Sequence, residues 1–173
     1  MNPVLRRRRK KGFQAYFHEK QAVGVAMQQG WGVGVVIPAR NEELHIAGVL
    51  ETLPPFVDLA VVINDGSTDA TEQYAREASS SANVIILNTG SIGVGGAIDA
   101  GHQYLLNQLE SPFVSTVMAG DGQMNPKDLE AIIEPVISKR YDHVKGDRSI
   151  HSKGYNNMPF VRKIASFILS FFT

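Results

Sequence analysis

Short apolar runs rich in β-branched residues alternate along the chain with segments whose apolar residues recur at helical spacing. An apolar run without alternating polar positions is typical of a strand buried on both faces of a parallel sheet. The pattern therefore predicts an α/β fold, with a mostly parallel sheet and helices on both of its faces. The expected strands are residues 33–37, 57–63, 84–87 and 113–118, followed by a weaker fifth run at 141–145.

Polar residues and prolines indicate where the expected helices begin. Asn41 is expected to cap the first helix and Asp69 the second, where Glu72 would complete a capping box. A third helix is expected from about residue 96 to residue 108. Pro126 marks the start of a fourth, since proline is favoured at the first helical position.

Composition and charge narrow the class of protein. The chain has 173 residues, 43% of them hydrophobic, which suits one domain of ordinary size with a real core. The lack of cysteine excludes disulfides and zinc–thiolate sites. Residues 1–20 hold seven basic residues and one acid, so this arm carries +6 and the remainder of the neutral chain carries −6.

Ligands of parallel sheets bind beyond the carboxyl ends of the strands, so the chemistry is expected in the loops there. Asp65 follows an apolar strand directly, where its carboxylate can accept hydrogen bonds from ribose hydroxyls or a nucleobase N–H. Asp121 takes the same place after a later strand. With Gln123 it offers hard oxygen ligands that suit Mg²⁺ or Mn²⁺ when phosphate oxygens complete the shell. The four loops are residues 38–42, 64–69, 88–96 and 119–125.

The third of these loops is rich in glycine. Gly93 and Gly95 begin a dinucleotide fingerprint, but Ile98 stands where the third glycine is required. The loop also follows the third expected strand instead of the first. Two interpretations stay open: a turn with close helix packing, or a direct contact with a ligand.

Three motifs stand in register at the ends of expected strands, and together they resemble the family-two glycosyltransferases. The resemblance covers residues 33–150 and is greatest to the branch of dolichol-phosphate mannose synthases and undecaprenyl-phosphate glycosyltransferases. The motifs are Pro38-Ala39-Arg40-Asn41-Glu42, Asn64-Asp65-Gly66-Ser67-Thr68-Asp69, and Gly120-Asp121-Gly122-Gln123 with Pro126.

This resemblance implies a GT-A (Rossmann-like) fold, a nucleoside-diphosphate-sugar donor and a divalent Mg²⁺ or Mn²⁺. It implies that Asp121 is the catalytic residue, and that Asp121 holds the metal with the help of Gln123. The positions that it implies for the nucleotide sugar are Pro38, Arg40, Glu42, Ile63, Asp65, Gly120 and Arg148.

The chain departs from the family pattern at three positions. Ala119 stands where the first aspartate of the D-x-D motif is usual, and Asn64 where the first aspartate of D-D-G-S is usual. Arg40 replaces the usual tyrosine of P-A-Y-N-E. The missing aspartate at position 119 lowers the expected affinity for the metal. The Arg40 guanidinium, in contrast, can offset the negative charge of a diphosphate.

The resemblance implies an enzyme of cell-envelope polysaccharide or glycolipid biosynthesis that moves a sugar to an acceptor with inversion. A polyprenyl phosphate is the expected acceptor. Such a phosphate is already ionised and needs no general base, and none is evident in the motifs. The alternative is a catalytically inactive nucleotide-sugar-binding module or fragment. A nicotinamide oxidoreductase is disfavoured because the glycine loop lacks the dinucleotide spacing. A sugar nucleotidyltransferase is disfavoured because it needs a glycine- and arginine-rich loop after the first strand, and residues 38–43 do not form one.

The two ends of the chain suggest a membrane surface. The basic arm is typical of a solvated tail or of a segment attracted to anionic lipid, and no nucleic-acid-binding module follows it, so nucleic acid is not expected. We expect peripheral contact at the cytoplasmic face of a membrane. The expected parts are a basic arm at 1–30, a nucleotide-sugar-binding GT-A domain at 31–150, and an amphipathic or apolar segment at 151–173 that ends abruptly, as in a truncated chain.

Overall fold

The computed structural model describes residues 30–146 and divides the chain into two compact units, Met1–Asp142 and His143–Thr173. Strands and helices alternate through the first unit, as the hydrophobic pattern predicts. The elements are β1 (Gly32–Ala39), α3 (Ile46–Glu51), β2 (Leu59–Asp65), α4 (Thr71–Glu77), β3 (Asn83–Thr89), α5 (Gly93–Gln108), β4 (Phe113–Val117), the 3₁₀ turn η2 (Pro126–Asp128) and α6 (Leu129–Ile137).

The four strands form one parallel sheet in the order β3-β2-β1-β4. The first strand thus lies inside the sheet, between β2 and β4. Its register pairs Ala39 with Asn64 of β2, and Val36 with Val117 of β4. Because all strands run the same way, their carboxyl ends share one edge, which we call the carboxyl edge.

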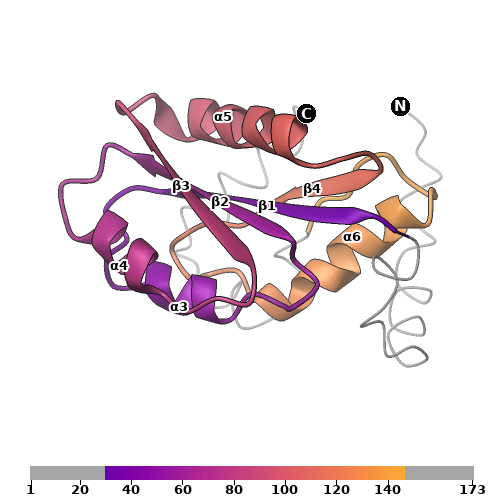
Figure 1. Ribbon diagram of the computed structural model, residues 1–173, viewed down its shortest axis with the longest axis horizontal. Helices are drawn as coiled ribbons and strands as arrows, with labels where there is room; N and C mark the ends of the chain where they lie inside the picture. The colour runs from indigo at the N-terminus through magenta and orange to yellow at the C-terminus, as the bar shows by residue number, and fades with distance from the viewer. Residues whose placement is uncertain (1–29, 147–173) are drawn as a thin grey trace, which may run out of the picture. The chain divides into compact units, whose positions relative to one another are not determined.

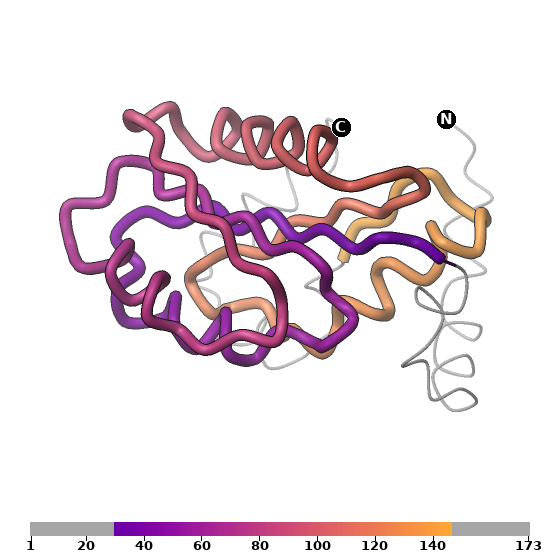
Figure 2. Tube along the Cα trace, viewed as in Figure 1, coloured from indigo at the N-terminus to yellow at the C-terminus, as the bar shows by residue number. Residues whose placement is uncertain are grey.

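Helices cover both faces of the sheet. Figure 1 shows α5 on one face and α3, α4 and α6 on the other. The tube in Figure 2 shows the path between them, in which α3, α4 and α5 each return the chain to the amino end of the next strand. This arrangement confirms the α/β fold with helices on both faces, and it explains why the inner strand β1 is apolar throughout.

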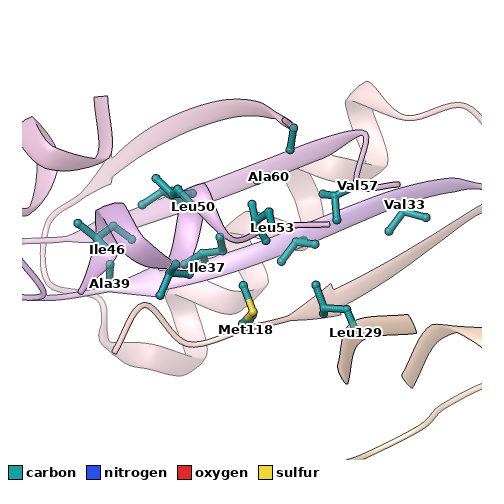
Figure 3. Close-up of a cluster of buried hydrophobic side chains, with 14 of the residues drawn as sticks. Val33, Ile37, Ala39, Ile46, Leu50, Leu53, Val57, Ala60, Met118 and Leu129 are labelled. Atoms are coloured by element: carbon teal, nitrogen blue, oxygen red, sulfur yellow. The ribbon is translucent and has the colours of Figure 1, made fainter. Parts of the chain in front are cut away.

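The larger core lies between the sheet and the three helices α3, α4 and α6. Alternate residues of β1 point into it, among them Val33, Val35 and Ile37, each at most 1% exposed. Met118, which follows β4, and Leu129 of α6 also belong to this core (Figure 3). This core anchors the strands whose ends carry the polar loops.

The second core lies under α5, where helix and sheet approach closely. A Cβ added at Gly101 of α5 would lie 2.3 Å from Cγ1 of Val36, and one added at Gly34 of β1 would lie 2.7 Å from Cδ1 of Leu105. The two glycines therefore allow α5 to settle directly on β1. Val61 and Ile63 of β2 complete this layer.

Three local expectations are wrong. Residues 141–145 form no strand, and the sheet described for residues 30–146 has four. Asn41 does not cap α3: it has a left-handed φ of 57°, and its side chain accepts a hydrogen bond from Thr68 N. Asp69 and Glu72 form no capping box: α4 begins at Thr71 after Ala70, so Glu72 is its second residue, and it pairs with Arg76 one turn along the helix. Asn125 does cap the turn at Pro126, accepting a hydrogen bond from Lys127 N at 3.2 Å.

Candidate functional site

The loops after β1, β2 and β4 meet at the carboxyl edge. Gly120 N donates to Pro38 O at 3.1 Å, which joins the loop after β4 to the end of β1. A Cβ at position 120 would lie 3.1 Å from the Ala39 Cβ, so only glycine allows this approach without displacement. Asp65 at the end of β2 and Asp121 in the loop after β4 therefore lie at the same edge, on either side of β1, as the strand pattern predicts.

Asp65, the last residue of β2, is only 4% exposed, and its carboxylate is held by the loop after β3. Oδ1 accepts the Thr89 hydroxyl and Ile92 N, both at 2.7 Å, and Oδ2 accepts Gly93 N at 2.8 Å. Gly93 is the first residue of α5, so the carboxylate satisfies N–H groups that a helix start leaves without partners. Asp65 thus ties β2 to α5.

These contacts also set the charge state of Asp65. The hydrogen bond from Thr89 is the main cause that lowers the pKa of the carboxyl below its usual value. Burial acts in the opposite direction, while the N–H groups of Ile92 and Gly93 and the charge of Arg40 add to the lowering. Asp65 is therefore an anion at neutral pH.

Backbone strain gathers where the β2 and β3 loops touch. Gly66 and Ser91 both have left-handed φ values, of 70° and 61°. A Cβ at Gly66 would lie 2.2 Å from the Ser91 Oγ, so the contact requires glycine there. Strained conformations of this kind persist only where neighbouring contacts hold them, and they are frequent at ligand sites.

Side chains link the loop after β1 to the loop after β2. Thr71 is fully buried, and its Oγ1 accepts Glu42 N at 2.7 Å while donating to Asp69 Oδ1. Asp69 Oδ2 accepts Glu43 N at 3.2 Å, and Glu43 Oε2 accepts Ala70 N at 3.0 Å. The backbone that carries Arg40 and Glu42 is thereby fixed against the start of α4.

Two charged side chains at the end of β1 remain accessible. Arg40 is exposed and forms no ion pair within residues 30–146, although its charge reaches Asp65. Glu42 is 24% exposed at its side chain, and its Oε2 lies 3.3 Å from Nδ1 of His45. Both can therefore approach a ligand at the edge.

The structure separates some of the expected site residues from the others. Ile63 is completely buried beneath α5, so its side chain supports the site and does not face it. Arg148 lies outside the described residues. Thr71 and Thr89 were not anticipated from the sequence, and their only signal was a hydroxyl residue near the end of an apolar strand or the start of a helix.

Residues 34–173 match the family model of glycosyl transferase family 2. The chain belongs to this family. The match spans every motif that suggested it, and the failed dinucleotide spacing of the glycine loop agrees with it.

Relatives of this family 2 chain include an uncharacterised protein and a named transferase. An uncharacterised protein of Methanocaldococcus jannaschii is 36% identical over 80% of this chain and 56% of its own length. The UDP-N-acetylglucosamine–dolichyl-phosphate N-acetylglucosaminyltransferase of Methanococcus voltae is 30% identical over 80% of this chain and 61% of its own length. The chain therefore spans little more than half the length of these relatives.

Solved structures agree with the fold of the family 2 chain. The glucosyl-3-phosphoglycerate synthase of Mycobacterium tuberculosis, in complex with Mn²⁺, UDP and phosphoglyceric acid, superposes with a TM-score of 0.50 at 26% identity. The alignment covers 65% of this chain and 41% of that chain. A second structure of that enzyme, with Mg²⁺ and UDP, gives the same TM-score at the same identity.

The donor set of this family 2 chain fits a divalent ion that is shared with phosphates. Asp121 is partly exposed, and its Oδ1 accepts Gln123 N at 3.0 Å, while its Oδ2 has no partner within residues 30–146. The same residues contain no group of three or more histidines, cysteines or acids that could hold a metal. Mg²⁺ is commonly bound by one or two carboxylates together with substrate phosphates, which is the case that Asp121 fits.

None of the helices in residues 30–146 has the length and apolar character that crossing a membrane requires.

Proposed function

We propose that the protein transfers a sugar from a nucleoside-diphosphate sugar to an acceptor, and that the carboxyl edge is its donor site. The observation that carries this proposal is the meeting of Arg40, Glu42, Asp65 and Asp121 at one edge in a family 2 chain. The nucleotide-bound structures of the mycobacterial synthase support the choice of donor class.

The proposed site has a nucleoside part and a diphosphate part. Glu42 supplies an acceptor for nucleobase or ribose donors, and Asp65 holds the neighbouring loop in place and retains lone pairs for a further donor. Pro38 and Gly120 form the floor on which a ligand can approach the backbone. Arg148 remains a proposed phosphate contact from the sequence.

The diphosphate is the leaving group of the reaction, and negative charge grows on it as the sugar is released. Arg40 and a divalent Mg²⁺ or Mn²⁺ would stabilise that charge, with Asp121 as a protein ligand of the ion and Gln123 beside it. The chain's own part is to orient the donor so that the anomeric carbon is open to attack from the opposite side. That geometry inverts the anomeric centre.

The acceptor that we propose is a polyprenyl phosphate at the cytoplasmic face of a membrane. The support is the Methanococcus voltae relative, whose name gives a dolichyl phosphate as its acceptor. An ionised phosphate oxygen attacks without a general base, which suits an edge at which Asp65 already accepts three hydrogen bonds from the end of β3 and the loop that follows it.

The test is a transfer assay on the purified chain and on any longer natural form. UDP- and GDP-linked hexoses and N-acetylhexosamines are supplied with Mn²⁺ and a short polyprenyl phosphate, and the product's anomeric configuration is read by NMR. Inverted glycosyl phosphate product is expected from at least one donor. Retention at the anomeric carbon, or a non-sugar product, would contradict the mechanism.

A second function, donor binding without turnover, is favoured by Ala119, which leaves the D-x-D motif with a single acid. A donor that shifts the melting temperature but is neither hydrolysed nor transferred by the longest natural form would favour this alternative. Asp121→Asn is the variant to compare with wild type in these assays, since it removes the charge and keeps the shape of the side chain.

A further inference from the structure

Arg40 is a cation at the carboxyl edge whose neighbouring acids already have other partners. Asp65 accepts three hydrogen bonds from the end of β3 and the loop after it, and Glu42 Oε2 lies 3.3 Å from Nδ1 of His45. Arg40 itself is exposed and takes part in no ion pair within the described residues 30–146. Its guanidinium is thus available to an anionic ligand.

The backbone beneath Arg40 is unusually well held for a surface loop. Asn41 N donates to Ser67 Oγ at 3.0 Å, and Glu42 N donates to the buried Thr71 hydroxyl at 2.7 Å. These bonds fix the residues on the C-terminal side of Arg40, and β1 fixes the N-terminal side. The base of the side chain is therefore positioned before any ligand binds, which lowers the ordering cost of binding.

The protein offers few side-chain ligands for a metal ion at the same edge. Asp121 offers one carboxylate, and one of its oxygens already accepts Gln123 N. Two residues earlier, Ala119 has no ligand atom in its side chain, and its N–H is directed at the sulfur of Met124 at 3.3 Å. One partly engaged carboxylate binds a divalent ion weakly unless phosphate oxygens supply further ligands.

We propose that Arg40 binds the donor's diphosphate directly, so that the nucleotide binds without the metal and the ion joins only as a partner of the bound diphosphate. A guanidinium can donate two parallel N–H bonds to a phosphate, which makes it well suited to this task. The proposal rests on the proposed function, because it concerns the same donor site.

The test is calorimetric titration of the 173-residue chain with UDP and with GDP, first in chelator and then with Mn²⁺. Wild type is expected to bind one of the two in chelator, and Arg40→Gln to bind it about tenfold or more weakly. Arg40→Lys should be intermediate, because it keeps the charge but loses the fork. Arg76→Gln is the matched control, since that arginine pairs with Glu72 on α4, and it should leave the affinity unchanged.

Electron paramagnetic resonance of Mn²⁺ gives an independent readout. The free chain is expected to bind Mn²⁺ weakly, and its complex with UDP or GDP to bind the ion more tightly. The substitution Ala119→Asp is expected to tighten the binding of Mn²⁺ to the free chain. Nucleotide binding that disappears in chelator, or an affinity that is unchanged in Arg40→Gln, would overturn this inference and leave the proposed function standing. A folded chain that binds neither nucleotide under either condition would overturn both.

Discussion

The carboxylate of Asp65 accepts the backbone N–H of Gly93 at 2.8 Å, so the last residue of β2 holds the first residue of α5. The contact joins the carboxyl edge to the helix that covers one face of the sheet. It gives Asp65 a positioning role that exists before any ligand arrives.

Asp65→Asn should therefore loosen the start of α5. The amide group would turn N–H donors towards Ile92 or Gly93, which themselves donate to this side chain in the native protein. Faster hydrogen exchange of these two amides and a lower melting temperature are expected. Unchanged exchange at both amides would show that the carboxylate does not hold the loop.

Acid should weaken the protein through the same carboxylate. The folded-state pKa of Asp65 lies below its ordinary value of 3.8, because Thr89 and two N–H groups stabilise the anion. The stability that it contributes is fully present above that ordinary value and is lost as the pH falls through the lowered one. Urea unfolding from pH 7 downwards should show a smaller acid-induced loss in Asp65→Asn than in wild type.

Gly101→Ala tests the close packing of α5. The added Cβ would lie 2.3 Å from Val36 Cγ1, and overpacking of a tight core costs about 1–3 kcal/mol. Gly48→Ala on α3 is the matched control, because its Cβ would meet nothing within 4 Å. Urea unfolding should show a loss in the first variant and no loss in the second. Equal stability of both would mean that α5 does not sit directly on β1.

Thr71→Val tests the link between the loops after β1 and β2. The fully buried hydroxyl accepts Glu42 N, and its removal leaves that N–H unsatisfied at a cost of about 1–3 kcal/mol. Donor affinity should fall as well, because Glu42 and Arg40 lose their support. Thr52→Val is the control, since the Thr52 hydroxyl bonds only carbonyls of its own helix. If calorimetry finds that Thr71→Val binds the donor as tightly as wild type, the hydrogen bond between Thr71 and Glu42 does not support donor binding.

Vesicle flotation tests the membrane proposal. The basic arm should bring the chain to anionic vesicles at low salt, because each basic charge near such a surface contributes about 1 kcal/mol. High salt or removal of residues 1–12 should release it. A chain that never floats with anionic vesicles would end the membrane proposal without affecting the donor site.

The parallel sheet and its edge could be predicted because strands buried on both faces leave a clear apolar pattern. The side of the sheet to which Asp65 points could have been predicted too. The residue shares the two-residue period of Val61 and Ile63, which face α5, so its carboxylate points to that helix. The conformation of Asn41 could not be predicted in this way, because its left-handed backbone depends on contacts with Ser67 and Thr68, which are distant in the sequence.

The central claim is that the carboxyl edge binds a nucleoside-diphosphate sugar. An NMR titration of the ¹⁵N-labelled chain with UDP- and GDP-sugars measures this directly, because each backbone amide reports separately. We predict that one donor shifts the amides of Arg40, Glu42, Asp65 and Asp121 together and leaves the amides at the amino ends of the strands unchanged. Saturable shifts confined to other parts of the molecule, or none with any donor, would contradict it.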